Sequence, residues 1–177
     1  MKIAMSKTRE QFPLSGKKPL KKTMPSIVSS VIFFVVILAG GLILASLLNW
    51  SFSLILLIII LIGALLSLSC FLIYQYQVWY FQVYFYDLTD DFIIIRKRVL
   101  TPMEITIPYE RIQDVYVDQD LFDRIFGLYD VHLSSATISS GMEAHIDGVE
   151  KAATDGLRKI ILEKVSEKIK RAKGGSV

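Results

Sequence analysis

Charged residues are missing from one long stretch of this chain. None of the 64 residues from position 23 to position 86 is Asp, Glu, Lys or Arg. A soluble domain of this size would expose such groups to water, whereas one helical membrane crossing needs about 20 apolar residues. A polar and aromatic interruption lies near the midpoint, at residues 49–51. We therefore expect two transmembrane helices, over residues 27–48 and 52–74, joined by a very tight turn.

Acidic and basic residues, histidine included, are absent from both expected spans. Proton relays, ion paths and coupling sites in membrane proteins usually depend on such groups. The two spans alone are therefore not expected to form a transporter or a channel, and an anchor is the better interpretation.

The chain is also poor in residues that carry chemistry. Its single cysteine, Cys70, lies in the second span, which excludes an intrachain disulfide and a cysteine-based zinc site. His132 and His145 fall opposite apolar sets on expected strands, where we expect them to face solvent. No spacing forces carboxylates to converge on them, and neither a nucleophile elbow nor a phosphate-cradling glycine loop is present. We predict no catalytic residue, no metal and no cofactor.

Basic and acidic residues are segregated along the chain. Residues 1–25 hold seven basic residues and one acid, residues 87–155 hold six and fourteen, and residues 157–173 hold seven and two. Lysine and arginine near the ends of membrane spans stay cytoplasmic, and the turn between the spans has neither. We expect a multi-pass protein of the cell membrane, with both termini cytoplasmic and only the turn outside.

Three regions follow from these patterns. Residues 1–25 are expected to be a basic cytoplasmic tail that is disordered or lies on the membrane surface. Residues 26–74 are expected to form the transmembrane hairpin. Residues 75–177 remain for a cytoplasmic domain, and about a hundred residues are enough for one small domain with its own core.

After the spans, short alternating segments separated by turn residues predict a mainly β domain. The expected strands are residues 80–88, 92–100, 103–107, 112–117, 129–138 and 142–146. Between the fourth and fifth strands, Leu121, Phe122, Ile125 and Phe126 recur at helical spacing instead. Gly127 can take the left-handed conformation that ends such a turn.

A long helix is expected at the end of the chain, over residues 149–172. Its apolar stripe consists of Ala153, Leu157, Ile160, Ile161, Val165 and Ile169. Asp147 and Glu150 have the spacing of an N-terminal capping box. A small antiparallel sheet with this helix across an open end or face would bury the stripe.

Five short phrases occur in order in the second half of the chain. They are Tyr-Asp-Leu-Thr-Asp at 86–90, Phe-Ile-Ile-Ile at 92–95, Ile-Pro-Tyr-Glu-Arg-Ile at 107–112, Val-Tyr-Val at 115–117 and Leu-Phe-Asp-Arg-Ile-Phe-Gly-Leu at 121–128. With two spans ahead of them, they resemble the bacterial pleckstrin-homology (PH) domain family 2, the YdbS-like two-span membrane proteins, over about residues 33–165.

This resemblance implies a pleckstrin-like antiparallel roll, a partly open barrel closed by a C-terminal α-helix. It does not imply an enzyme. The chain departs from the family at one turn, where the family often has a glycine and basic residues after the second strand. Here Arg96, Lys97 and Arg98 are followed by Val99, so we expect a differently built turn.

Anionic lipid is one partner that the basic residues could contact. Eukaryotic PH domains typically bind inositol phosphates around the first hairpin turn, but here that turn holds Asp90 and Asp91, which would repel phosphate. The basic residues elsewhere could bind headgroups, or could only set the topology and keep a strand soluble. The candidates for lipid contact are Lys17, Lys18, Lys21, Lys22, Arg96, Lys97, Arg98 and Arg111.

A protein is the other expected partner. An apolar turn in an acidic frame could dock a basic partner, or its apolar residues could instead plug the open end of the sheet. The candidates for partner contact are Asp118, Asp120, Leu121, Phe122 and Asp123.

The sequence thus favours a non-enzymatic, membrane-anchored module for binding and assembly. It would hold a protein partner, such as a related membrane protein or a further copy, at the cytoplasmic face of the membrane. The alternatives are an anionic-lipid-sensing module and an accessory subunit of a membrane transport complex. Neither nucleic acid nor a small-molecule substrate is expected as a partner.

Overall fold

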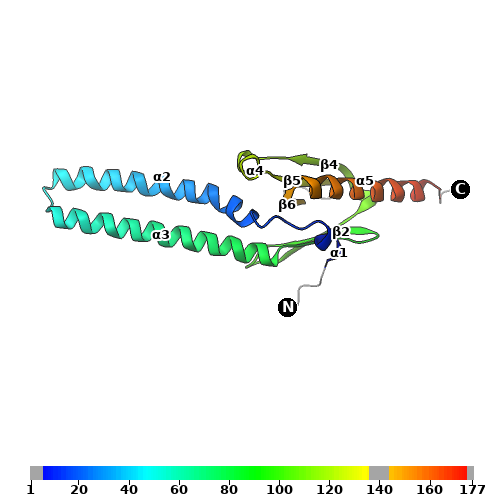
Figure 1. Ribbon diagram of the computed structural model, residues 1–177, viewed down its shortest axis with the longest axis horizontal. Helices are drawn as coiled ribbons and strands as arrows, with labels where there is room; N and C mark the ends of the chain where they lie inside the picture. Colours follow the sequence, from blue (N-terminus) through cyan, green and yellow to red (C-terminus); the bar gives the residue numbers. More distant parts are fainter. Residues whose placement is uncertain (1–5, 136–143, 175–177) are drawn as a thin grey trace. The chain divides into compact units, whose positions relative to one another are not determined.

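The chain divides into two compact units. The computed structural model describes residues 6–135 and 144–174, and Figure 1 shows the order of the elements. One unit is Lys22–Val78, and the other combines Met1–Lys21 with Trp79–Val177. The second unit is therefore built from both sides of the uncharged stretch, whereas the sequence suggested three consecutive regions.

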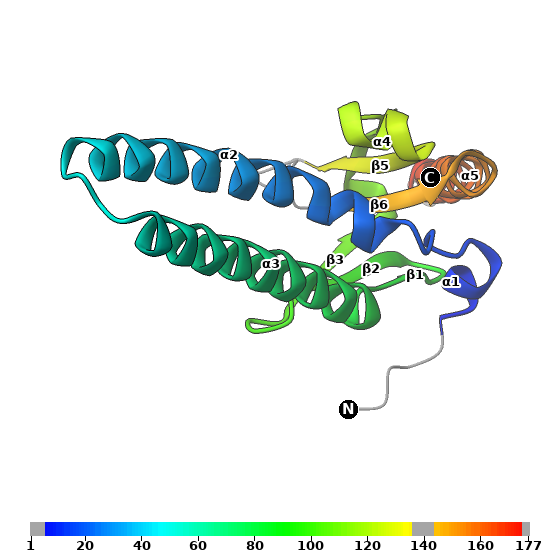
Figure 2. The ribbon, with the colours of Figure 1, turned by 60° about the vertical axis from the view of Figure 1, so that its left-hand side comes forward.

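The first unit is formed by two long apolar helices, α2 (Lys18–Leu47) and α3 (Phe52–Val83), which run antiparallel beside each other (Figure 2). By length and composition both could cross a membrane. Gly41 and Ala45 line a narrow space between the helices together with Ile55, so small side chains let the backbones approach. The two predicted helices and the turn between them are confirmed.

Helix α3 continues further than the predicted span. Its helical conformation runs to Val83, so the strand expected from residue 80 is wrong for its first half. The stretch is rich in aromatic residues, whose preference for strands depends on their surroundings, and it contains neither Gly nor Pro to stop a helix. At 1.5 Å per residue, the 32 residues of α3 span about 48 Å.

The first sheet contains β1 (Phe85–Leu88), β2 (Phe92–Lys97) and β3 (Met103–Pro108) in that order, all antiparallel. Alternate residues of β2 and β3 face the core, so that Ile93 pairs with Ile107 and Ile95 with Ile105.

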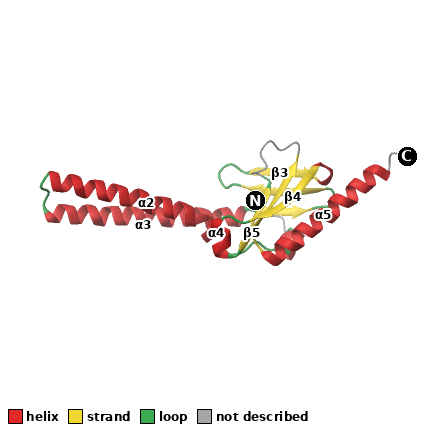
Figure 3. Cartoon of the chain, turned by 90° about the horizontal axis from the view of Figure 1, so that it is seen from above, coloured by secondary structure: helices red, strands yellow, loops and turns green. Residues whose placement is uncertain are grey.

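A 3-10 turn, η1 (Tyr109–Arg111), leads to the second sheet. This sheet is formed by β4 (Ile112–Asp118), β5 (Leu128–Ser135) and β6 (His145–Glu150), again in chain order and antiparallel. The sheets do not join into one barrel: the structure is an open roll (Figure 3). The predicted ends of the last two strands, at residues 136–143, lie outside the described residues.

The short helix α4 (Leu121–Phe126) forms where helical spacing predicted it. Asp120 and Asp123 make a reciprocal capping box at its start, and Gly127 ends it with φ 68° in the left-handed region. Because each of these signals is local in sequence, this element was predictable in detail.

The last helix, α5 (Lys151–Gly174), packs on η1 and on the second sheet. Leu157 and Ile161 are buried, as the apolar stripe predicted. The predicted capping box is wrong, because β6 continues to Glu150 and the Asp147 carboxylate is bonded elsewhere.

The segment before the first apolar helix is part of this domain. It forms a short helix, α1 (Lys7–Gln11), and Leu14 then pairs with Val149 at the edge of β6. The Tyr86 hydroxyl donates to the Phe12 carbonyl, and the Ser6 and Thr8 hydroxyls donate to the Asp87 carboxylate at 2.7 and 2.9 Å. The expectation of a structureless tail is therefore wrong for residues 6–21.

Two glycines with positive φ give a matched test of this packing. Gly148 has φ 74°, and a Cβ there would lie 2.8 Å from the Lys18 side chain, whereas a Cβ on Gly127 would meet nothing within 4 Å. We expect Gly127→Ala to destabilise the domain by about 1–2 kcal/mol, the cost of a left-handed alanine. Gly148→Ala should cost about 1–3 kcal/mol more, because Lys18 must move. Denaturant unfolding of the full chain in detergent measures both, and equal losses would contradict the packing of Lys18 on Gly148.

Candidate functional site

Two lysine side chains are buried where the N-terminal segment crosses the domain. Lys18 is 1% exposed and forms an ion pair with Asp147, which is itself buried. The Lys18 ammonium also lies 3.4 Å from the centre of the Tyr84 ring. Burial raises the pKa of the Tyr84 hydroxyl well above its ordinary value, so this group stays neutral and donates to the His145 carbonyl at 2.8 Å.

Lys21 is 2% exposed and faces three carboxylates. Its ammonium lies 2.6 Å from Asp123, 3.4 Å from Asp130 and 3.5 Å from Asp120. Burial works to raise the pKa of Asp120, but the backbone N–H of Asp123 and the Lys21 charge outweigh it and hold this pKa below its usual range. Asp130 also accepts from the Gly148 N–H at 2.8 Å. The cluster thus fastens the first turn of α2, at Lys21, to α4 and to the second sheet.

These contacts bear on the candidates for lipid and partner contact. The structure places Lys18 and Lys21 inside the domain, where their charges are engaged by aspartates rather than presented to headgroups. Asp123 is likewise fully buried. Lys17 is exposed, with its ammonium 3.5 Å from the Phe126 carbonyl. Lys22 belongs to the helical unit.

The outer side of α4 exposes two large apolar residues. Leu121 is 70% exposed and Ile125 is 66% exposed, and their spacing of four residues puts them on one face of the helix. Phe122 is half-buried, while Asp118 and Asp120 remain exposed beside this face. Leu121 and Ile125 therefore do not plug the open end of the sheet. This leaves an ordered apolar tip, defined as Leu121 and Ile125.

The two histidines are half-buried and form a stack with Tyr116. Ring centres lie 4.8 Å apart for Tyr116 and His132, and 5.2 Å apart for His132 and His145. Asp118 lies 3.1 Å from His132, and Asp147 lies 3.4 Å from His145. The expectation of solvent-facing histidines is therefore only partly met.

Asp118, Asp130 and His132 place potential metal-ligand atoms within 4.8 Å of one another. However, Asp130 already accepts from Gly148 and faces the Lys21 ammonium, which would repel a cation. We assign this cluster to hydrogen bonding within the fold.

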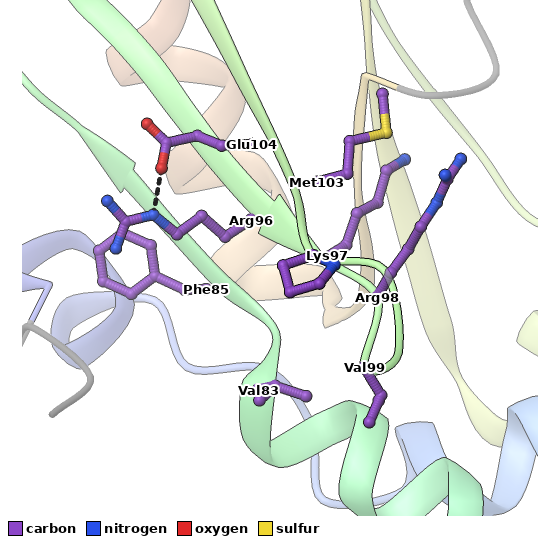
Figure 4. Close-up of a pocket in the computed structure, with 9 residues that line it drawn as sticks. Val83, Phe85, Arg96, Lys97, Arg98, Val99, Met103 and Glu104 are labelled. Carbon is purple, nitrogen blue, oxygen red and sulfur yellow. Dashed lines mark hydrogen bonds and ion pairs between the residues drawn. The ribbon is translucent and has the colours of Figure 1, made fainter. Parts of the chain in front are cut away.

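The three bases at the end of β2 border a cavity of about 290 Å³. Its apolar walls are Val83, Phe85, Val99, Pro102 and Met103. Arg96 forms an ion pair with Glu104 and lies over the Phe85 ring, at 5.3 Å from the ring centre (Figure 4). Arg111 lies on η1 and is not among the lining residues.

The turn between β2 and β3 is built differently from a glycine turn, as expected. Arg98 itself adopts the left-handed conformation, with φ 74°. By contrast, the acidic first hairpin turn is held by α5. Lys164 pairs with Asp90 at 3.2 Å, and Lys168 pairs with Asp91.

An open roll of two three-stranded antiparallel sheets with a C-terminal helix defines a pleckstrin-like domain, a class of proteins that are generally binding modules rather than enzymes. The bacterial PH domain family matches residues 22–165, most of the chain. The chain therefore belongs to the bacterial PH domain family. Neither curated proteins nor solved structures give a significant match. Residues 6–21, which pack on the domain ahead of the apolar hairpin, lie outside the matched range.

The buried lysines give a second matched test. Lys21→Met would leave the carboxylates of Asp123 and Asp130 without their buried cation, so we expect a loss of about 3–5 kcal/mol in unfolding free energy. Lys17→Met removes the same charge at the surface and should change stability by less than about 0.5 kcal/mol. Denaturant unfolding compares the two variants, and similar small losses would show that Lys21 does not hold the domain together.

Proposed function

We propose that this chain is a non-enzymatic, membrane-anchored binding module that holds a protein partner at the cytoplasmic face of the cell membrane. The observation that carries the proposal is which segments of the chain form the folded domain. Residues that precede the apolar hairpin and residues that follow it belong to one compact unit.

A domain built from segments on both sides of the hairpin supports two membrane crossings, with both ends of the chain on the same side. Lys18 and Lys21, which precede the hairpin, are ion-paired to aspartates of the domain that follows it. A single crossing would place these groups on opposite sides of the bilayer, where they could not meet. The basic residues before the hairpin and their absence from its turn favour the cytoplasm as that side.

Labelling of single cysteines tests this topology. In a Cys70→Ser background, Asn49→Cys should react with a membrane-impermeant maleimide on intact bacterial cells. Lys7→Cys and Lys170→Cys should react only after the membrane is opened, and a reporter fused after Val177 should be active only in the cytoplasm. External labelling at Lys170→Cys would contradict the orientation. Labelling of Lys7→Cys and Lys170→Cys from opposite sides would contradict the hairpin itself.

The apolar tip of α4 is the surface that we assign to the partner. Leu121 and Ile125 are exposed, yet the helix that carries them is fixed by the Asp120–Asp123 capping box and by Gly127. An ordered apolar pair loses little conformational entropy when it is covered, which favours protein binding. Lys21, which is followed directly in the chain by the apolar hairpin, forms an ion pair with Asp123 of α4. A chain anchored in this way meets partners anchored in the same membrane, so such a partner is the best fit.

Replacing the tip with acids tests this assignment. We expect Leu121→Asp with Ile125→Asp to leave unfolding free energy within about 0.5 kcal/mol, because both side chains are already exposed. Cross-linking in native membranes, from a photoreactive residue at Arg124, should lose its protein adducts by about tenfold or more. Leu162→Asp, on exposed α5, is the matched control. Unchanged protein adducts, or adducts with lipid alone, would contradict the assignment.

A further inference from the structure

Residues 6–16, which we call the strap, cover one edge of the second sheet. They lead from α1 to the start of α2 (Figure 2). The outer strand of this sheet is β6, where Leu14 pairs with Val149 and the Ser15 N–H donates to the Gly148 carbonyl at 2.9 Å. An outer strand that is not covered offers its backbone N–H and C=O groups to an extended peptide. The strap thus occupies a position that a segment of another protein could take.

The groove between β6 and α5 accommodates two apolar side chains of the strap. Phe12 packs against Gly156 of α5, where a Cβ would overlap the Phe12 ring, and Leu14 is buried in the core cluster. Pro13 between them is exposed. A peptide that adds to a sheet edge gains affinity from its main chain and specificity from alternate side chains. The groove therefore selects an aromatic residue and a leucine two positions apart.

The strap is held differently from the residues that follow it. Its polar anchors include the bonds from the Ser6 and Thr8 hydroxyls to the Asp87 carboxylate. Directly after the strap, the chain is held by the buried ion pairs of Lys18 and Lys21. Segments with few buried side chains open locally while the rest of a domain stays folded. The strap can therefore leave the groove while the two lysines keep the domain together.

Part of the groove stays open beside the strap. A cavity of about 430 Å³ lies between residues 11–16 and the junction of β6 with α5, where Glu150, Ala152 and Ala153 form its other wall. A partner segment with larger side chains here gains contacts that the strap lacks. Such contacts matter because tethering gives the strap an effective concentration of about millimolar, which a partner must overcome.

We propose that the groove between β6 and α5 is a binding site for an extended segment of a partner protein, and that the strap blocks it until it is displaced. The segment presents an aromatic side chain against Gly156 and a leucine beside Val149, as the strap does with Phe12 and Leu14. The strap precedes the residues that the bacterial PH domain family matches, 22–165, so membership of the family does not explain it.

This inference goes beyond the function proposed above. The groove shares no residue with the tip of α4, and its occupation does not depend on membrane anchoring.

Binding of a separate peptide tests the proposal. A fluorescein-labelled peptide of residues 6–16 is titrated against the full chain in detergent, and its anisotropy is measured. The unaltered chain should bind the peptide weakly, because its own strap fills the groove. The loosened chain, Phe12→Ala with Leu14→Ala, should bind at least tenfold more tightly, because the apparent Kd falls as the open groove becomes more populated. Glu10→Ala, at an exposed position of the strap, is the matched control and should bind like the unaltered chain.

Gly156→Ala separates the groove from general loosening. Alanine is favoured over glycine inside a helix, so adding Gly156→Ala to the loosened chain should not lower its melting temperature. The added methyl group occupies the place of the incoming aromatic ring, so the gain in peptide binding should be lost. A peptide that carries Phe12→Ala should likewise fail to bind the loosened chain. Retained binding in either case, or equally weak binding by the unaltered and loosened chains, would overturn the proposal.

Hydrogen exchange gives a measurement on the unaltered chain. The Ser15 N–H should exchange at least tenfold faster than the Gly148 N–H, which donates to Asp130, because the strap opens while the domain stays folded. Equal rates would show that the strap does not detach and would overturn the proposal. Thr8→Val is a second variant that keeps both apolar side chains of the strap. It removes the hydroxyl bonded to Asp87, so it should speed exchange at Ser15 and strengthen peptide binding.

Two further outcomes test the identity of the occupant and the independence of the groove. Dimers of the loosened chain that the peptide does not dissociate, measured by light scattering, would show that the strap only protects β6 from a second copy. Leu121→Asp with Ile125→Asp, added to the loosened chain, should leave peptide binding unchanged. A loss there would show that the groove is not independent of the tip of α4. Either of these contrary results would overturn the proposal.

Discussion

Two buried lysine–carboxylate clusters hold the structure together. Burying an ammonium group costs several kcal/mol unless anions and hydrogen bonds surround it. Lys18 meets this condition with Asp147, and Lys21 meets it with Asp123, Asp130 and Asp120. Because the lysines and their partners are separated by about a hundred residues and by both apolar helices, these pairs fix the path of the whole chain.

The clusters also determine which surfaces are left for binding. Lys21 fixes the start of α4, and so it fixes where Leu121 and Ile125 are exposed. Elsewhere in the domain, Val83 at the end of α3 forms a wall of the cavity that Arg98 borders. The exposed tip and the cavity both belong to the unit formed by residues 1–21 and 79–177.

Much of the fold was predictable from local patterns. The absence of charge predicted the two apolar helices, the alternation of side chains predicted the strands, and helical spacing followed by Gly127 predicted α4. The end of α3 was misplaced because aromatic residues after Tyr74 suit a strand in a sheet and a helix at an interface equally well. Asp147 was assigned to a helix cap because its spacing to Glu150 fits one, although its carboxylate serves Lys18 in the fold.

The candidate sites were also predictable only where their residues are neighbours in sequence. Arg96, Lys97 and Arg98 are adjacent in sequence, so their grouping was evident, but the apolar cavity beside them combines the end of α3 with two strands. Lys18 and Lys21 look like Lys17 in the sequence, since each is a lysine in a basic segment. Only the folded chain separates them, because burial depends on partners far away in sequence.

By itself, the sequence determined the apolar helices, the order of strands and the C-terminal helix, since each follows from a repeating pattern of neighbouring residues. The tertiary structure alone decided that the N-terminal segment joins the domain, which lysines are buried and which apolar residues of α4 remain outside. These features depend on the cost of burying charge, and that cost is set by contacts between distant parts of the chain.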